Sequence, residues 1–422
     1  DVRHGRHDDW HRPRVNVAFG WGALRALGVS EADAATFPRE FRSGMADRAR
    51  ILSDDPASWR FGAPGQPTLD VLVLAFAKTE RALDAFAADV LARLAGALDL
   101  AHQDRAIRPR GGREHFGFRD GIANPIVRGL AHAKRSPEPE CATGEFVLGH
   151  KNGYDKWPAS PSVDRALDAF DELPGAPGGR KDLGFDGTYL VYRKLEEDVG
   201  RFRAFLKQAT LEQLGKDDVG AEEWLAARIV GRWKSGAPVA LAPERDDPKL
   251  ALANAFLFGG EAGTTCPVGA HVRRANPRDA LPPDPATSLE NVSRHRILRR
   301  GRRYGREAPS PLPPSDAGDR GIVFICLNAN LERQFEFVQQ TWIHSTKFAA
   351  LYDESDPLVG RRDGGAHRFS LQGAPARVRL RGLPEFVTMR GGGYFFLPGL
   401  RALRALLGVA PKRRADGARA TT

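Results

Sequence analysis

Residues 263–305 contain side chains that could carry out redox or acid–base chemistry. His271 lies in a loop framed by glycine and proline, a proline-rich excursion follows, and an arginine cluster runs from Arg294 to Arg303. A histidine can bind a metal or move a proton, and an arginine can stabilise negative charge. This grouping indicates a functional site rather than a core element.

A lone histidine is more often structural than a ligand, so the neighbouring residues are needed to show whether His271 could bind a metal. The chain has no C-x-x-C-H motif, which excludes covalent haem attachment of that kind, and no H-E-x-x-H or nearby second ligand for zinc. Cys266 is an alternative thiolate haem ligand, but its spacing from Phe258 and Gly259 is wrong for the usual monooxygenase pattern. His271 is the better ligand candidate, and the small residues Gly269 and Ala270 before it would allow close approach of a flat group.

Asp120, in the sequence GFRDG, is a second candidate for chemistry. The commoner interpretation of such a residue is a turn aspartate that accepts backbone N–H bonds. The functional interpretation is a carboxylate at a cavity edge that accepts a proton. Within the arginine cluster, Ile297 and Leu298 indicate that its flanks are not all exposed, so one arginine could point into a cavity.

The hydrophobic periodicity predicts strands and helices in an order that occurs once before residue 125 and again after residue 185. Strands are predicted at residues 15–19, 68–77 (buried), 187–195 and 321–328, with a final hairpin at 386–389 and 393–397. Helices are predicted at residues 20–27, 40–52, 79–98, 196–214, 221–233, 331–341 and 400–407. This order predicts an open sheet covered by helices on one face.

The same pattern predicts the domain organisation. An N-terminal half covers residues 1–130, irregular connecting loops cover 131–184, and a C-terminal half with the candidate site covers 185–410. Residues 411–422 form a basic tail that is expected to be disordered.

Composition limits the classes of partner. The net charge is +10, but the basic residues are mostly arginines spread along the chain, so a nucleic-acid partner is not expected. No apolar run approaches the roughly eighteen residues of a membrane span. Three cysteines cannot form a disulfide framework, and the polar N-terminus lacks a secretory signal, so a cytoplasmic location is expected. Nothing in the composition indicates the oligomeric state.

Taken together, these stretches resemble the dye-decolorizing (DyP-type) haem peroxidases. The matching stretches occur in the family's order between about residues 15 and 408: EHFGFRDGIANP, GEFVLGHKNGYDKWPASP, GTYLVYRKLEEDV, VGRWKSGAP, CPVGAHVRRANPRD, HRILRRGRRYG, NANLERQFEFVQQTWI and GGGYFFLPGL. Each stretch alone is a weak signal, whereas eight in order are specific.

The resemblance implies an α+β fold of two ferredoxin-like halves, each an antiparallel sheet with helices packed on it, and haem b bound in the second half. It implies a peroxidase that uses H2O2 to oxidise dyes or other aromatic or phenolic substrates. It also implies His271 as the proximal iron ligand, Asp120 as the distal carboxylate and Arg299 as the distal arginine.

Further roles follow from the same resemblance. Ile322 and Phe324 would line the distal pocket, and Asp356 is a candidate acceptor for the free nitrogen of His271. Trp342 and Tyr304 match positions where family members can carry oxidisable residues, although core packing is the commoner role of such aromatics.

The chain departs from the family at its start, where a strand and a helix usually precede the segment VNVAF. The N-terminal half is therefore expected to lack its first strand and helix. An alternative hypothesis is a haem carrier or iron-handling protein that uses the same pocket without turnover. It would share His271 but would not need Asp120 or Arg299.

Overall fold

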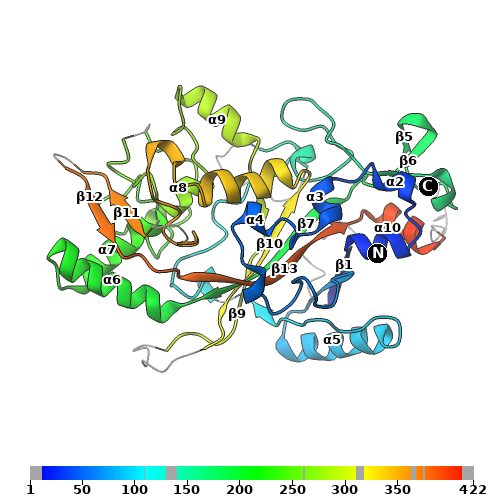
Figure 1. The fold of residues 1–422 in the computed structure, drawn as a ribbon, viewed down its shortest axis with the longest axis horizontal. Helices are drawn as coiled ribbons and strands as arrows, with labels where there is room; N and C mark the ends of the chain where they lie inside the picture. Colours follow the sequence, from blue (N-terminus) through cyan, green and yellow to red (C-terminus); the bar gives the residue numbers. More distant parts are fainter. Residues whose placement is uncertain are drawn as a thin grey trace, which may run out of the picture.

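The computed structural model describes residues 12–108, 110–129, 140–259, 262–309, 318–362, 367–373 and 376–410. Three predicted regions lie outside the described residues: the tail, the part of the connecting segment before residue 140, and residues 1–11. The expected lack of a first strand and helix concerns the last of these regions. Figure 1 shows a long sheet crossing the molecule, with helices packed along it.

The main sheet has the order β2-β1-β13-β7-β10-β9-β3, with β8 also paired to β10, and all of these pairs are antiparallel. Its strands are β1 (Arg14–Phe19), β2 (Val71–Phe76), β3 (Ala106–Ile107), β7 (Thr188–Glu197), β8 (Leu298–Arg299), β9 (Arg302–Tyr304), β10 (Gly321–Asn328) and β13 (Val387–Leu397). Strands from both predicted halves join in this sheet, because Phe19 of β1 pairs with Phe396 of β13. The fold is α+β with antiparallel sheets, as predicted.

The remaining strands of the described residues form two small sheets. They consist of β4 (Ser162–Val163), β6 (Arg180–Asp182) and β5 (Gly175–Ala176), and of β11 (Arg368–Leu371) and β12 (Val378–Arg381). The first of these sheets falls in the segment predicted to be irregular.

The helices lie along and at both ends of the main sheet, with α6 and α7 at one end and α1 and α10 at the other (Figure 1). They are α1 (Trp21–Ala26), α2 (Glu31–Ala34), α3 (Arg39–Ser43), α4 (Ala49–Leu52), α5 (Glu80–Leu94), α6 (Val199–Leu214), α7 (Val219–Val230), α8 (His271–Ala275), α9 (Pro285–Ser293) and α10 (Leu400–Leu407). Two π-helical segments follow β10, η9 (Glu332–Glu336) and η10 (Val338–Ile343). Short 3-10 turns occur at η2 (Pro56–Ser58), η3 (Arg110–Gly112), η5 (Thr143–Glu145), η6 (Arg165–Leu167), η7 (Pro177–Gly179), η8 (Pro248–Leu250) and η11 (Phe348–Ala350).

Several predicted elements differ from the structure for identifiable reasons. The helix predicted at 40–52 is two short helices, because Gly44 adopts a φ of +80° that ends α3. The strand predicted as buried at 68–77 is the edge strand β2, most of whose residues are only half-buried. The proline-rich excursion contains α9, which begins where the Asp284 side chain accepts the Thr287 N–H and Pro285 takes the first helical position.

The predicted final hairpin is wrong, because residues 387–397 form one continuous strand. The glycines at 391–393 do not turn the chain; they allow a bulge after Met389 and a close approach to neighbouring backbone. A Cβ on Gly392 would lie 2.1 Å from the carbonyl oxygen of Tyr192. The strand therefore needs glycine in order to pair with β7.

Packing on this sheet positions the site. One buried cluster joins Phe41, Tyr189 and Phe396 under α1, α3 and α10, and another joins Phe202 and Phe386 under α6 and α7. No helix in the described parts of the chain is both long and apolar enough to cross a membrane.

Candidate active site

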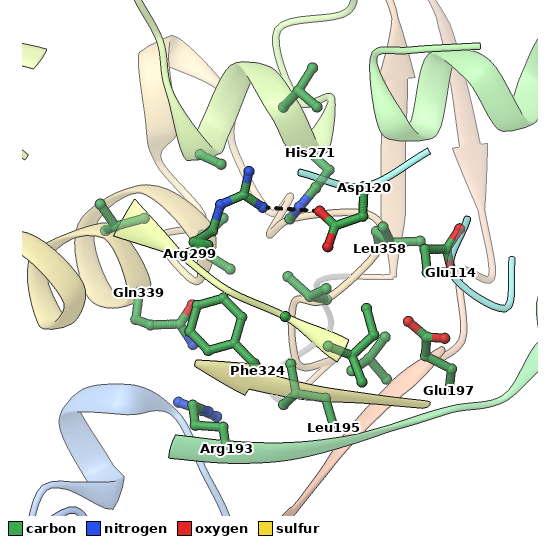
Figure 2. A pocket seen from close by; sticks show the side chains of 18 of the residues that line it. Glu114, Asp120, Arg193, Leu195, Glu197, His271, Arg299, Phe324, Gln339 and Leu358 are labelled. Atoms are coloured by element: carbon green, nitrogen blue, oxygen red, sulfur yellow. Dashed lines mark ion pairs between the residues drawn. The ribbon is translucent and has the colours of Figure 1, made fainter. Parts of the chain in front are cut away.

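A cavity of about 380 Å³ lies between β10, α8, the end of β7 and the loop that carries Asp120. Figure 2 shows side chains from these separate elements converging on it. Its walls are largely apolar, and the apolar side chains include Leu195, Val230, Val272, Ile297, Ile322, Phe324, Phe335, Val338, Ile343, Leu358, Val359 and Met389. A large apolar pocket with a few polar groups is typical of a site for an organic ligand or cofactor.

His271 is the first residue of α8, and it lines the cavity. Its Nδ1 lies 3.0 Å from Oδ2 of Asp356. Because a carboxylate accepts, Nδ1 is the donor of this hydrogen bond, and a neutral imidazole in this tautomer has the lone pair of Nε2 available for a ligand bond.

Asp356 is fully buried, and it accepts N–H bonds from Leu358 and Val359 at 2.9 Å each. Burial raises the pKa of the Asp356 carboxyl, but the charge and hydrogen bond of His271, followed by the charge of Arg274, hold that pKa below its ordinary value. The acceptor predicted for His271 is thus within hydrogen-bond distance of it, and it is held in its ionised form.

Asp120 and Arg299 meet on another part of the wall, where Nη1 of Arg299 lies 3.6 Å from Oδ1 of Asp120 (Figure 2). The Asp120 N–H donates to Gly112, and Asn124 of the same loop accepts the Arg299 N–H at 2.9 Å. The loop therefore holds both the carboxylate and the strand β8 that carries the guanidinium. Asp120 also accepts the Gly121 N–H at 2.6 Å, as the turn interpretation predicts, so the two interpretations are compatible.

Ile322 and Phe324 both line the cavity, and Val323 between them is buried on the opposite face of β10. The period of two along a strand explains this, because alternate side chains point to opposite faces. The structure thus brings His271, Asp120, Arg299, Ile322 and Phe324 together.

The small residues before His271 have another role than the one predicted. Gly269 and Ala270 are not among the cavity-lining residues, and a Cβ on Gly269 would lie 3.4 Å from Leu351 and Phe369. Their size allows the loop to pack on the core. Cys266 is also fully buried away from the cavity, and burial raises the pKa of its thiol to about 12, so it is a structural thiol.

Trp342 and Tyr304 are both 5% exposed and do not line the cavity. Trp342 packs edge-on against Phe337 and His295, with ring centroids 5.3 Å apart in each pair. The Lys194 ammonium lies 4.5 Å from the Tyr304 ring centroid. Their packing agrees with the core role given above as the commoner one.

Sequence reasoning missed other groups on the cavity wall. His344 is a second histidine there; burial lowers its pKa to about 3, and its Nδ1 accepts the Arg361 N–H at 3.4 Å. Glu114 and Glu197 also line the cavity. Glu114 and Glu197 belong to the family-like stretches EHFGFRDGIANP and GTYLVYRKLEEDV, which were the available signal, whereas His344 lies outside the family-like stretches.

Comparisons with known proteins identify curated relatives that match most of the chain. No protein-family model matches the chain. A dye-decolorizing peroxidase of Mycena epipterygia is 32% identical over 93% of this chain and 76% of its own length. Another, from Mycetinis scorodonius, is 32% identical over 94% of this chain and 76% of its own length.

Solved structures give the same result at the level of the fold. A structure of a variant dye-decolorizing peroxidase from Pleurotus ostreatus superposes with a TM-score of 0.76 and 27% identity, covering 94% of this chain and 85% of that one. The identity and coverage of these relatives show that the chain belongs to the dye-decolorizing peroxidase family and is a haem-dependent peroxidase.

Proposed function

We propose that this protein binds haem b and uses H2O2 to oxidise dyes or other aromatic or phenolic substrates. In this proposal His271 is the proximal ligand, and Asp120 and Arg299 are the distal acid–base and charge-stabilising groups. The observation that carries it is that His271 and the Asp120–Arg299 pair face one cavity from separate elements.

The cavity fits a haem. Its apolar walls would bury a flat macrocycle, and the hydrogen bond between Nδ1 of His271 and Asp356 leaves Nε2 as the ring nitrogen that would bind the iron. Ile322 and Phe324 would exclude water on the distal side. Bound haem would supply the redox chemistry by which peroxide is reduced and the organic substrate is oxidised.

Of the two proposed distal residues, Asp120 would transfer a proton and Arg299 would stabilise negative charge. The Asp120 carboxylate can take a proton from one peroxide oxygen and return it to the other. The Arg299 guanidinium stays charged and donates through a rigid fork, so it can stabilise the negative charge that develops as the O–O bond breaks. Arg299 lies 3.6 Å from the Asp120 carboxylate, so both groups would act at the same place in the cavity.

The proposed reducing substrates follow from charge and from the relatives. The net charge of +10 would attract anionic aromatic molecules, and the relatives are named for their action on dyes. Peroxide and an organic reductant are therefore the proposed small-molecule partners.

The test is rapid mixing of the haem-loaded protein with H2O2, followed by absorbance. Asp120→Asn and Arg299→Leu should each slow the peroxide-dependent change by at least about 100-fold, since each removes a transition-state interaction. Arg300→Leu is the matched control: Arg300 is the next residue, but it is exposed and does not line the cavity.

Unchanged rates in both Asp120→Asn and Arg299→Leu would contradict the distal roles. Haem binding without any peroxide-dependent change in the wild type would instead favour the haem-carrier alternative, which needs His271 but neither of the two distal residues.

A further inference from the structure

Two glutamates on the cavity wall have no role in the proposal above. Glu114 lies in the loop that leads to Asp120, and Glu197 is the last residue of β7. Figure 2 shows both carboxyl groups on the same side of the cavity, beyond Asp120 as seen from Arg299. Glu197 is only 5% exposed.

Backbone groups, not cations, hold these carboxyl groups. Glu114 accepts the N–H groups of Phe116 and Phe118 at 2.6 Å each, and Glu197 accepts the His115 N–H at 3.3 Å. In the described parts of the chain, neither glutamate has an ion-pair partner within 4.0 Å. Glu197 is buried and Glu114 is partly buried, and carboxyl groups removed from water without a cation are costly when ionised, which favours the protonated form.

The negative charges of neighbouring carboxylates also favour the protonated form of Glu114 and Glu197. Burial, and then the charge of Asp120, raise the pKa of Glu114 to about 8, although the two backbone N–H bonds lower it. Burial and the charge of Glu114 raise the pKa of Glu197 well above its ordinary value. Arg303 of β9 opposes both effects, but it pairs with Glu307 at 3.6 Å.

His115 adds no charge of its own. Burial lowers its pKa to about 4, and its Nε2 lies 2.7 Å from the Tyr304 carbonyl oxygen. At neutral pH the imidazole is therefore uncharged, and the pair keeps at least one proton beside the cavity.

Backbone hydrogen bonds fix the position of Glu114 relative to Asp120. Arg113 and Arg119 form an antiparallel bridge, and the Glu114 N–H donates to the Phe118 carbonyl at 3.0 Å. The Asp120 N–H closes the loop by donating to Gly112 at 2.8 Å. A proton held on Glu114 is thus stored on the same small loop that carries the proposed acid–base group.

We propose that Glu114, paired with Glu197 in the cavity wall, supplies the protons that Asp120 needs during turnover. This role rests on the proposed function. Reduction of H2O2 to two waters takes up two protons and two electrons, and the organic substrate supplies the electrons. The step assigned here moves a proton from the Glu114 carboxyl to the Asp120 carboxylate, after which Glu114 takes a proton from solvent; it moves no electrons.

The first test is infrared spectroscopy of the purified protein over a pH series, which needs no turnover. Wild type should show a protonated carboxyl band that disappears with a midpoint near pH 8, and Glu114→Gln should lack that component. Glu196→Gln is the matched control, because Glu196 precedes Glu197 on β7 but pairs with Arg60 and Arg390 instead of lining the cavity. A wild-type spectrum without protonated carboxyl at pH 7 would overturn the proposal.

The second test is the pH dependence of kcat in the haem-loaded enzyme. Wild type should lose activity above about pH 8, whereas Glu114→Gln should be about tenfold slower at pH 6 and show no inflection near pH 8. Glutamine keeps an acceptor for the loop N–H groups, so a purely structural role would lower kcat without removing the inflection. An unchanged inflection in Glu114→Gln would overturn the proposal.

The two tests separate this inference from the proposed function. If wild type showed the infrared band but no peroxide-dependent turnover, the proposed function would fall, and the proton-supply role would fall with it. If turnover were normal and the band absent, only the role of Glu114 would fall.

Discussion

At the scale of single residues, the geometry of the site depends on the hydrogen bonds that hold each side chain. Asp356 takes one hydrogen bond from His271 on one oxygen and two backbone N–H bonds on the other. This leaves His271 little freedom to rotate, so its Nε2 is pre-oriented toward the cavity. Outer partners of this kind fix a ligand's tautomer and ring orientation.

Asp104 gives a prediction about pH and stability. It accepts hydrogen bonds from Tyr192 at 2.6 Å and Lys194 at 2.8 Å, and His102 lies 2.9 Å away. Burial raises the pKa of Asp104, but the bonds from His102, Lys194 and Tyr192 hold it at about 2. Because this is below the unfolded value of about 3.9, the ionised carboxylate stabilises the fold above about pH 4, and that stability is lost as the pH falls toward 2.

Asp104→Asn should therefore lower the free energy of unfolding by about 2 kcal/mol at pH 7, and by much less near pH 2. Urea unfolding at both pH values measures the difference. An equal loss at both pH values would contradict the role of the charge.

The site residues could be named from sequence only in part. Asp120, His271 and Arg299 occur in family-like stretches, whereas Asp356 lies outside them in the sequence DPLVG. The structure brings all four to one cavity or its immediate support. The storage role inferred for Glu114 could not be predicted, because its raised pKa arises from burial and from neighbours brought close only by folding.

At the scale of elements, β13 shows how closely the backbones of neighbouring central strands approach each other. Gly392→Ala would bring a Cβ to 2.1 Å from the Tyr192 carbonyl oxygen, so the β13–β7 pairing must shift. We expect a loss of about 1–3 kcal/mol in the free energy of unfolding.

Gly175→Ala is the matched control for Gly392→Ala. Gly175 also lies in a strand, but a Cβ there would meet nothing within 4 Å. It should change the free energy of unfolding by less than about 0.5 kcal/mol. Equal losses in the two variants, measured by chemical denaturation, would refute the close-approach argument.

Elements with a strong local signal were predicted well. β10 and α10 have the predicted bounds. The local sequence is sufficient for both, because an apolar run defines the strand and an amphipathic run defines the helix. The hairpin predicted in place of β13 was wrong, because a glycine run has the same sequence whether it turns the chain or lets a neighbouring strand approach. That choice depends on Tyr192, some 200 residues earlier.

At the scale of the whole molecule, buried ion pairs connect regions far apart in sequence. Arg48, just before α4, binds Glu336 of η9 through two bonds of 3.0 and 2.5 Å, and Glu336 also accepts the Tyr394 hydroxyl. The Glu336 side chain is 2% exposed. Arg48→Met would leave this carboxylate buried without its cation, which typically costs about 3–5 kcal/mol.

Thermal and urea unfolding of Arg48→Met measure that cost. The double variant Arg48→Met with Glu336→Leu should recover most of the loss, because replacing both partners removes the unpaired charge. A single variant as stable as wild type would show that the pair does not hold the two regions together.

The central claim, that His271 is the ligand of a catalytic haem, is tested most directly by the absorption spectrum of haem-reconstituted protein. The His271→Ala variant should lose the histidine-ligated spectrum of the wild type. His344→Ala, which removes the other histidine on the cavity wall, should retain it. A wild-type spectrum in His271→Ala, or its loss in His344→Ala alone, would contradict the assignment.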